Sequence, residues 1–259
     1  PMCIAATILK IKFVIYENNL IIGRANKYLL PFAEKIFVSC KSLEGVPKKY
    51  EDKILEIGNI VRKEMINLKN ENSESKNLNT INILVLGGSQ AAKIFAEQLP
   101  RIFEKLKNSG MTIKVYQQCR DEQKYSLTEF YKNVNIECEI FNFTTKIINY
   151  YSKANLVITR SGASVLGELI NVKIPFVAIP LPGSADNHQL KNAIYFKKKG
   201  FGFLVQEKDI NDQLFSLIKS IFTNSSLIKN ILVNQSQYSD KNIFININTH
   251  IEKIINEKN

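Results

Sequence analysis

The sequence contains few of the residues that build metal sites and redox centres. It has two histidines and four cysteines among 259 residues. No two cysteines have a metal-binding or redox spacing, and a chain of this length does not need disulfides to fold. The two histidines lie far apart in the sequence. We therefore expect no zinc site, and the cysteine content fits a reducing cytoplasm. The cysteines are Cys3, Cys40, Cys119 and Cys138.

Long hydrophobic runs are also absent. No stretch of about 18 consecutive apolar residues occurs, so no transmembrane helix is expected. The segment 1–17 has neither a basic leader nor a signal-peptide cleavage pattern. It is typical of the inside of a domain, with a helix through Leu9 followed by a strand from Phe13 to Ile15. Because the first residue is Pro1, we expect the chain to begin partway through its first domain.

The chain is basic, with a formal net charge of +11. Such a charge favours an anionic partner, either nucleic acid or phospholipid headgroups. The lysines are scattered and no nucleic-acid-binding motif occurs, so we expect no nucleic-acid partner. A composition generally rich in lysine, isoleucine and asparagine explains most of the charge. We expect the remaining positive charge to make a modest contribution to membrane binding.

Apolar runs alternate with amphipathic segments along the whole chain, which predicts an α/β protein of two domains with parallel sheets and a cleft between them. The polar segment 68–80 has no apolar periodicity and is the best candidate for a linker. We assign residues 1–76 to the first domain with its linker and residues 77–259 to the second. The second domain includes a terminal helix with an apolar stripe, which predicts core packing. The stripe consists of Phe244, Ile247, Ile251, Ile254 and Ile255.

The central unit of the chain spans residues 156–192. An apolar run at 156–159 predicts a buried parallel strand, and a small polar turn at 160–164 leads into a helix over 165–171. Ser161 or Ser164 is the expected cap of that helix. A second buried strand follows at 176–179, and His188 and Gln189 open the next helix.

Four polar side chains of this unit are expected at the same edge of the sheet: Ser164, Glu168, His188 and Gln189. A helix that begins just past a strand directs free N–H groups to that edge, where an anion such as a pyrophosphate can bind. The alternative is a plain βαβ unit with a serine cap, in which Glu168 is simply a carboxylate favoured by the helix dipole. The convergence of the four side chains favours a ligand site.

A glycine turn, Gly87-Gly88-Ser89-Gln90, follows the predicted strand at 81–86. It lacks the second half of the dinucleotide fingerprint and therefore favours a sugar nucleotide over NAD. For each of two residues in the first domain, the sequence is consistent with two different roles. Asn19 follows a strand end and is either a turn residue or a ligand-binding amide. Arg62 is either a solvated charge or a group that faces a phosphate.

Four motifs in order give the chain a resemblance to the MurG family of bacterial glycosyltransferases. RSGAS…E followed by DNHQ…NA resembles the C-terminal half of the family. Residues 83–94 resemble its GGSQG loop, with Ala91 at the last glycine. Residues 16–26 resemble its HEQN…G…N segment, with Tyr16 at the histidine, and residues 58–62 resemble GNPVR, with Ile60 at the proline. Together the motifs cover nearly the whole chain.

The resemblance implies the GT-B architecture, two Rossmann-like domains facing a cleft, with the first domain incomplete. It implies that Glu168 holds the ribose hydroxyls, that His188 and Gln189 contact the sugar, and that the main chain at Phe143 and Thr144 reads the uracil. Asn19 and Arg62 would reach in from the first domain. The pyrophosphate side would be held by Ser89 and by the turn of Ala163, Ser164, Val165, Leu166, Gly167 and Glu168.

The implied reaction transfers N-acetylglucosamine from UDP-N-acetylglucosamine to undecaprenyl-pyrophosphoryl-muramyl-pentapeptide, which converts lipid I to lipid II. It proceeds by direct displacement without a cofactor or metal, at the cytoplasmic face of the bacterial inner membrane, whose anionic surface is a further expected partner. The family's proposed base is a histidine near an N-terminal glycine-rich loop, and the sequence contains no such loop. The catalytic residue is therefore unassigned.

Two alternatives to this function stay open at the sequence level. One is a different GT-B enzyme, either a UDP-N-acetylglucosamine 2-epimerase or a lipid glucosyltransferase. The other is an inactive sugar-nucleotide-binding fragment. Because the second domain carries the expected donor motifs and the first lacks the proposed base, we expect the chain to bind the donor without transferring the sugar.

Overall fold

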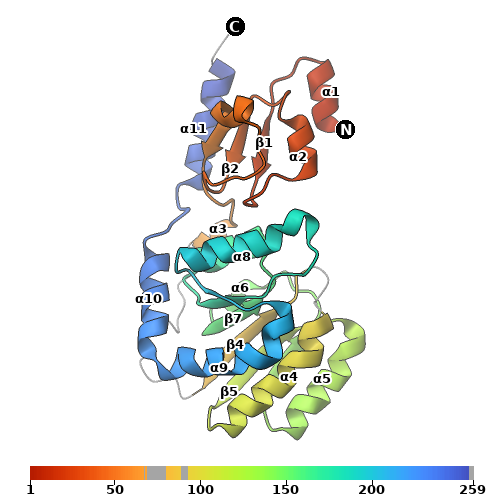
Figure 1. Cartoon of the computed structure of the whole chain (residues 1–259), viewed down its shortest axis with the longest axis vertical. Coiled ribbons are helices and arrows are strands. Elements are labelled where there is room, and N and C mark those ends of the chain that lie inside the picture. The colour runs from red at the N-terminus through yellow and green to blue at the C-terminus, as the bar shows by residue number, and fades with distance from the viewer. Residues whose placement is uncertain (67, 69–79, 89–92, 257–259) are drawn as a thin grey trace.

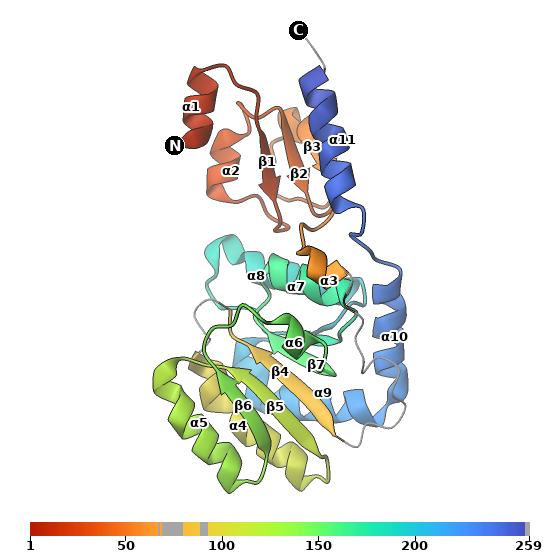
Figure 2. The ribbon, with the colours of Figure 1, turned by 180° about the vertical axis from the view of Figure 1, so that it is seen from behind.

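Two α/β units, one above the other, make up the protein (Figures 1 and 2). The computed structural model describes residues 1–66, 68, 80–88 and 93–256. Most of the segment expected to link the domains, and Ser89 and Ala91 of the glycine loop, lie outside the described residues. Each unit is built on a parallel sheet, because each strand is followed by a helix or long loop that returns the chain to the same end of the sheet.

The upper unit contains a three-stranded parallel sheet with the order β1-β2-β3. The lower unit contains a six-stranded parallel sheet with the order β6-β5-β4-β7-β8-β9. The strands are β1 (Val14–Glu17), β2 (Lys35–Val38), β3 (Ile54–Glu56), β4 (Ile81–Leu86), β5 (Ile113–Gln118), β6 (Glu137–Phe141), β7 (Leu156–Thr159), β8 (Phe176–Ala178) and β9 (Phe203–Leu204).

Helices cover both faces of the six-stranded sheet. One core lies between the sheet and α4, α5 and α9, and a second lies between the opposite face and α3, α6, α7 and α8. Strands buried on both faces explain the continuous apolar runs, such as the fully buried β7. The helices are α1 (Met2–Ile8), α2 (Arg24–Leu29), α3 (Lys63–Ile66), α4 (Lys93–Asn108), α5 (Asp121–Asn133), α6 (Ile148–Tyr151), α7 (Ala163–Asn171), α8 (His188–Lys198), α9 (Ile210–Thr223), α10 (Ser225–Ser236) and α11 (Ile243–Asn256).

The C-terminal helix α11 packs on the sheet of the upper unit. Ile243 and Ile254 of α11 form a cluster with Phe37 of β2 and with Ile57, which follows β3. The sequence-based assignment of this helix to the second domain is therefore corrected. Of the predicted stripe, Ile254 is buried, Ile247 and Ile251 are partly buried against this cluster, and Phe244 is 37% exposed. A stripe also does not specify which sheet it covers. Ile255, which we included in the stripe, is 66% exposed.

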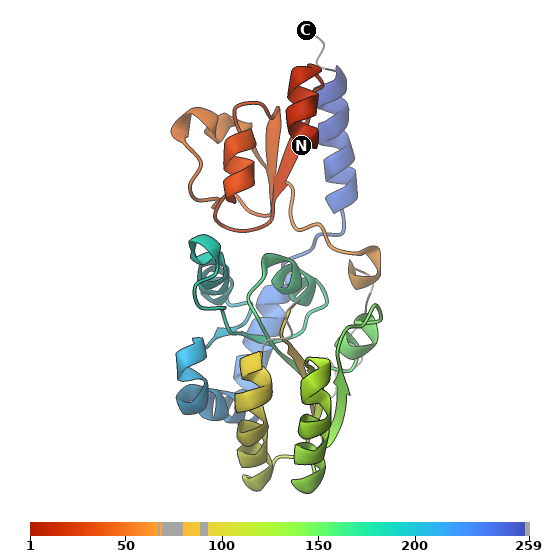
Figure 3. The same cartoon turned by 90° about the vertical axis from the view of Figure 1, so that its right-hand side faces the viewer.

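The chain crosses between the units twice, once before α3 and once between α10 and α11 (Figure 3). A buried carboxylate joins the two crossings. Asp240 Oδ1 accepts a hydrogen bond from the backbone N–H of Asn59 (3.1 Å) and another from Tyr238 Oη (3.0 Å). Asp240 Oδ2 accepts one from Asn171 Nδ2 of α7 (2.6 Å). Gly58, at a φ of +100°, leaves the space that Asp240 fills, because a Cβ there would lie 2.3 Å from Asp240 Oδ1.

The strands expected at 81–86, 156–159 and 176–179 and the helices expected from residues 165 and 188 begin within two residues of those positions. The predicted caps of α7 are wrong: the N-cap is Gly162, and no side chain caps the helix. Ser164 lies inside the first turn instead, where Asn18 Nδ2 donates to its Oγ (3.1 Å). Helices α5 and α10 were not predicted, because their apolar periodicity is weak and their sequences are largely polar.

Replacing Asp240 with asparagine should destabilise the protein. The amide supplies one acceptor oxygen where the carboxylate supplies two, so at least one buried donor from Asn59, Asn171 or Tyr238 loses its partner, at a cost of about 1–3 kcal/mol. Thermal unfolding should show a lower midpoint for Asp240→Asn. The same change at the exposed Asp52 is the matched control and should leave the midpoint unchanged. Equal midpoints for the two variants would contradict the role of Asp240.

Candidate functional site

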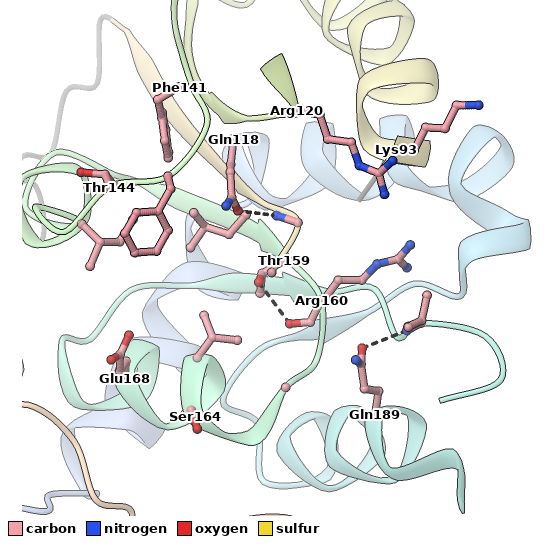
Figure 4. Close-up of a pocket in the computed structure, with 18 of the residues that line it drawn as sticks. Lys93, Gln118, Arg120, Phe141, Thr144, Thr159, Arg160, Ser164, Glu168 and Gln189 are labelled. Carbon is pink, nitrogen blue, oxygen red and sulfur yellow. Dashed lines mark hydrogen bonds between the residues drawn. The ribbon is translucent and has the colours of Figure 1, made fainter. Parts of the chain in front are cut away.

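A cavity of about 1100 Å³ lies at the carboxyl ends of the central strands of the lower unit (Figure 4). Leu86 ends β4, Gln118 ends β5, Phe141 ends β6 and Thr159 ends β7, and all four residues line it. This edge is where open α/β sheets bind their ligands, since the helices that follow the strands begin there. Arg62, which directly precedes α3 at the end of the first crossing, completes one wall.

Helix α7 presents its N-terminus to this cavity. Gly162, Ser164 and Val165 line the cavity, and the N-cap Gly162 has an extended backbone (φ −65°, ψ 136°). The first-turn N–H groups and the positive end of the helix dipole therefore face the cavity. No side chain caps the helix, so these N–H groups have no side-chain acceptor. This arrangement suits a negatively charged ligand group.

Glu168 lies about one turn into α7 and is held from two sides. Its Oε1 accepts hydrogen bonds from Arg62 Nη2 (3.0 Å) and Nε (3.2 Å), and its Oε2 accepts one from Tyr151 Oη (3.1 Å). Burial, reinforced by the neighbouring carboxylate of Glu168, raises the pKa of Tyr151 well above its usual value. Tyr151 therefore remains a hydrogen-bond donor, and the carboxylate is fixed in place at the cavity wall.

Cationic side chains outnumber anionic ones around the described part of the cavity. Four cationic residues line it, namely Arg62, Lys93, Arg120 and Arg160, against the two glutamates Glu168 and Glu207. Figure 4 shows Lys93, Arg120 and Arg160 on the side of the cavity away from Glu168. An excess of positive charge concentrates anions in a cleft. A ligand with a diphosphate next to a hydroxyl-bearing ring would match this distribution.

Arg160 is a site residue that the sequence reasoning passed over. It follows β7 directly, and its Nη1 donates to the carbonyls of Ile179 and Pro180, both at 3.3 Å. Its Nη2 bonds Glu207, and its guanidinium stacks on the ring of Phe95 at 4.7 Å. Arg160 thereby ties β7 to the loop after β8. Its position one residue past a buried strand was the available signal.

Gln118 and Gln189 hold two loops around the cavity. Gln118 Oε1 accepts the N–H of Gly87 (3.2 Å), at the start of the glycine turn. Gln189 Oε1 accepts the N–H of Leu181 (3.0 Å), in the loop after β8, which leaves its amide NH₂ available to a ligand. Both bonds are drawn in Figure 4. Of these two residues, sequence reasoning found only Gln189.

The structure brings most of the predicted site residues to this cavity. Seven of them line it: Arg62, Phe143, Thr144, Ser164, Val165, Glu168 and Gln189. The ring of Phe143 is 79% exposed, whereas Phe141 stacks on Tyr150 with ring centroids 4.5 Å apart.

Five predicted residues of the described chain do not line the cavity. His188 instead has its Nδ1 2.7 Å from the carbonyl of Ala185. Asn19 bonds Glu17 and accepts a bond from Asn192 Nδ2 (3.2 Å), so it joins the two units. The other three are buried in or under α7: Ala163, Leu166 and Gly167.

Comparison with known proteins identifies relatives of this chain. Residues 82–243 match the family model for the glycosyltransferase family 28 C-terminal domain. The chain is 39% identical over 261 residues to the UDP-N-acetylglucosamine–N-acetylmuramyl-(pentapeptide) pyrophosphoryl-undecaprenol N-acetylglucosamine transferase of Pelagibacter ubique (strain HTCC1062), covering 99% of this chain and 71% of the relative. It is 32% identical over 233 residues to the transferase of the same name from Rickettsia bellii (strain RML369-C), covering 87% of this chain and 65% of the relative.

Solved structures share the fold. The Acinetobacter baumannii MurG crystal structure superposes with a TM-score of 0.76 at 23% sequence identity, covering 97% of this chain and 69% of that one. The Staphylococcus aureus MnaA–UDP structure superposes with a TM-score of 0.70 at 13% identity, covering 98% of this chain and 72% of that one. At these identities the likeness establishes the fold alone.

Neutralising Glu207 should loosen the cavity wall. In Glu207→Gln the Arg160 guanidinium, whose side chain is 9% exposed, loses its anionic partner. Glu207 itself is partly solvated, so the expected cost is about 1–2 kcal/mol rather than that of a fully buried pair. Thermal unfolding should show a lower midpoint. Glu122→Gln is the matched control, because Glu122 pairs with Arg120 across 3.9 Å at the surface. A midpoint as high as that of the control would refute this role.

Proposed function

The chain belongs to glycosyltransferase family 28, in its MurG group of N-acetylglucosaminyltransferases, and from this premise we propose that the cavity described above binds the UDP-N-acetylglucosamine donor. The reaction of the MurG group transfers N-acetylglucosamine to the lipid-linked muramyl-pentapeptide, converting lipid I to lipid II. The two parallel-sheet units have the GT-B architecture. MnaA shares that fold, so sequence identity, not architecture, favours the MurG group.

The observation that carries the proposal is the pairing of Glu168 with the uncapped start of α7 in one cavity. A UDP-sugar carries the diol of its ribose close to its diphosphate. A fixed carboxylate is a strong acceptor for two hydroxyl groups. Free N–H groups at a helix N-terminus are suited to the diphosphate. Glu168 and Ser164 lie on the same side of α7, four residues apart, which matches the order of these groups in the donor.

The uracil and the sugar of the donor are assigned to opposite ends of the cavity. We assign the uracil to the main chain at Phe143 and Thr144, beyond Glu168. The sugar is assigned to the opposite end, where the amide NH₂ of Gln189 is available. Arg160 and Lys93 lie on that side and supply positive charge for the diphosphate.

During transfer the bond from the anomeric carbon to the diphosphate oxygen breaks as the acceptor hydroxyl attacks from the opposite face. Negative charge then grows on the departing UDP. The α7 N-terminus and the cationic side chains stabilise that charge, which is electrostatic catalysis by groups already in place. Among the described residues that line the cavity, the carboxylates are Glu168, assigned to the ribose, and Glu207, paired with Arg160, so we assign no base to the acceptor hydroxyl.

Glu168→Ala should weaken UDP-N-acetylglucosamine binding about tenfold to a hundredfold, because a charged hydrogen-bond partner is worth about 1.5–3 kcal/mol. Isothermal titration calorimetry measures the affinity without requiring transfer or an acceptor. Glu252→Ala, on the exposed face of α11, is the matched control. If Glu168→Ala binds the donor as tightly as this control does, the ribose assignment is wrong.

A second proposal concerns the membrane, where the lipid-linked acceptor resides. None of the helices in the described part of the chain is long and apolar enough to span a bilayer. Helix α1 nevertheless buries none of its residues, and Ile8 and Leu9 are 75% and 67% exposed. Lys10 and Lys12 flank this apolar segment. We infer that it rests on the anionic inner leaflet, with apolar side chains inserted and lysines at the headgroups.

Replacing Ile8 and Leu9 together with glutamate should reduce co-sedimentation with vesicles that contain anionic phosphatidylglycerol. The matched control is Val233→Glu on α10, an exposed apolar residue of the other unit. Replacing Lys10 and Lys12 with glutamine should also reduce binding, and added salt should mimic this change. Binding that is indifferent to lipid charge and to these replacements would exclude α1 as the contact.

A further inference from the structure

The hydroxyl of Tyr16 lies where the upper unit meets the donor cavity. Tyr16 belongs to β1, and its Oη accepts the backbone N–H of Ile60 at 3.1 Å. Its own hydrogen faces Asn18 Oδ1 at 3.0 Å and the Gly58 carbonyl at 3.3 Å. Burial raises the pKa of Tyr16 to about 12, so the phenol stays protonated and keeps both roles, donor and acceptor.

The first connection runs through Asn18. Because Oδ1 of this amide accepts from Tyr16, its Nδ2 is turned the other way, toward Ser164 Oγ at 3.1 Å. Ser164 lines the donor cavity. A serine oxygen that accepts from Asn18 has its own hydrogen left to donate elsewhere. Asn18 thereby orients the Ser164 hydroxyl as a donor at the start of α7.

The second connection runs through the segment 58–62. Tyr16 holds the N–H of Ile60 and contacts the carbonyl of Gly58, so it fixes the turn on both sides of Asn59. Arg62, two residues after Ile60, donates its two hydrogen bonds to Glu168. The direction of the Arg62 side chain, and with it the position of the Glu168 carboxylate, therefore depends on the conformation of this turn.

We infer that the Tyr16 hydroxyl is a positioning group that aims Asn18 at Ser164 and Arg62 at Glu168, and so preorganises the donor site from the other domain. This inference rests on the proposed donor site. Tyr16 acts through Asn18 and Arg62 and touches no residue of α7 in any hydrogen bond of the described structure. Preorganised groups bind a ligand more tightly because they lose less freedom on binding.

Tyr16→Phe tests this inference, since it removes the hydroxyl and keeps the ring. In titrations with UDP-N-acetylglucosamine the affinity should fall about threefold to tenfold, the usual worth of one or two neutral hydrogen bonds. Tyr28→Phe removes the hydroxyl of an 80% exposed tyrosine and should leave the affinity unchanged. In a background with Asn18→Ala and Arg62→Ala, the further change Tyr16→Phe should have less than about a twofold effect, because the groups that it positions are gone.

Each outcome decides between the inference and the proposed donor site. If the unchanged chain does not bind the donor, the proposed site fails. If it binds and Tyr16→Phe binds equally well, only the inference is overturned. An equal loss of affinity in both backgrounds also overturns it, because the hydroxyl would then act through general stability. Should Tyr16→Phe not fold, Asn18→Ala decides: weaker binding supports the inference and unchanged affinity overturns it.

Discussion

The arrangement of the two units depends on one buried carboxylate. Asp240 lies between α10 and α11, and it is 5% exposed. It collects hydrogen-bond donors from the first crossing, from α7 and from its own segment. Burial raises its pKa, and these three hydrogen bonds, together with a fourth from Asn59 Nδ2 to Oδ2 (3.4 Å), oppose that rise. A buried carboxylate with several directed donors tolerates few alternative geometries. The two chain crossings are therefore fixed to each other beside α7.

Neutral amides supply further contacts between the units, beside the ion pairs Lys191–Glu44 and Arg24–Asp186. Asn192 is fully buried, accepts the Leu20 N–H (3.2 Å), and donates to Asn19 Oδ1 (3.2 Å) and to the Ser161 carbonyl (3.1 Å). Asn59 packs closely on Gly167: a Cβ at position 167 would lie 2.9 Å from Asn59 Cγ. Amides both donate and accept without the cost of burying a charge. They define a specific contact between the two units beside α7 and α8.

The cavity has two opposing electrostatic requirements, positive charge for a diphosphate and a negatively charged acceptor for hydroxyl groups. Its cationic residues and the start of α7 suit a diphosphate, while Glu168 must remain an acceptor for hydroxyl groups. Arg62 meets the second requirement, because it lies at the end of the first crossing and holds the carboxylate from the side. The proposed donor site is built mainly on the lower unit, and Arg62 reaches it from the first crossing. In our inference Tyr16 acts on a ligand that it does not touch, through Asn18 and Arg62.

The sequence by itself determined the local structure and the edge of the sheet where the site lies. Apolar runs such as 156–159 specify buried strands, and parallel strands bring their carboxyl ends together, so Glu168, Ser164 and Gln189 were found from spacing and motif alone. Only the tertiary structure decided the partners of these residues. The stripe on α11 could not say which sheet it covers, Arg160 had no role assigned although it opens the RSGAS motif, and Ser164 looked like a cap. The contacts of Asp240 and Tyr16 join positions far apart in the chain, and no local pattern encodes such pairings because they arise only when the two units meet.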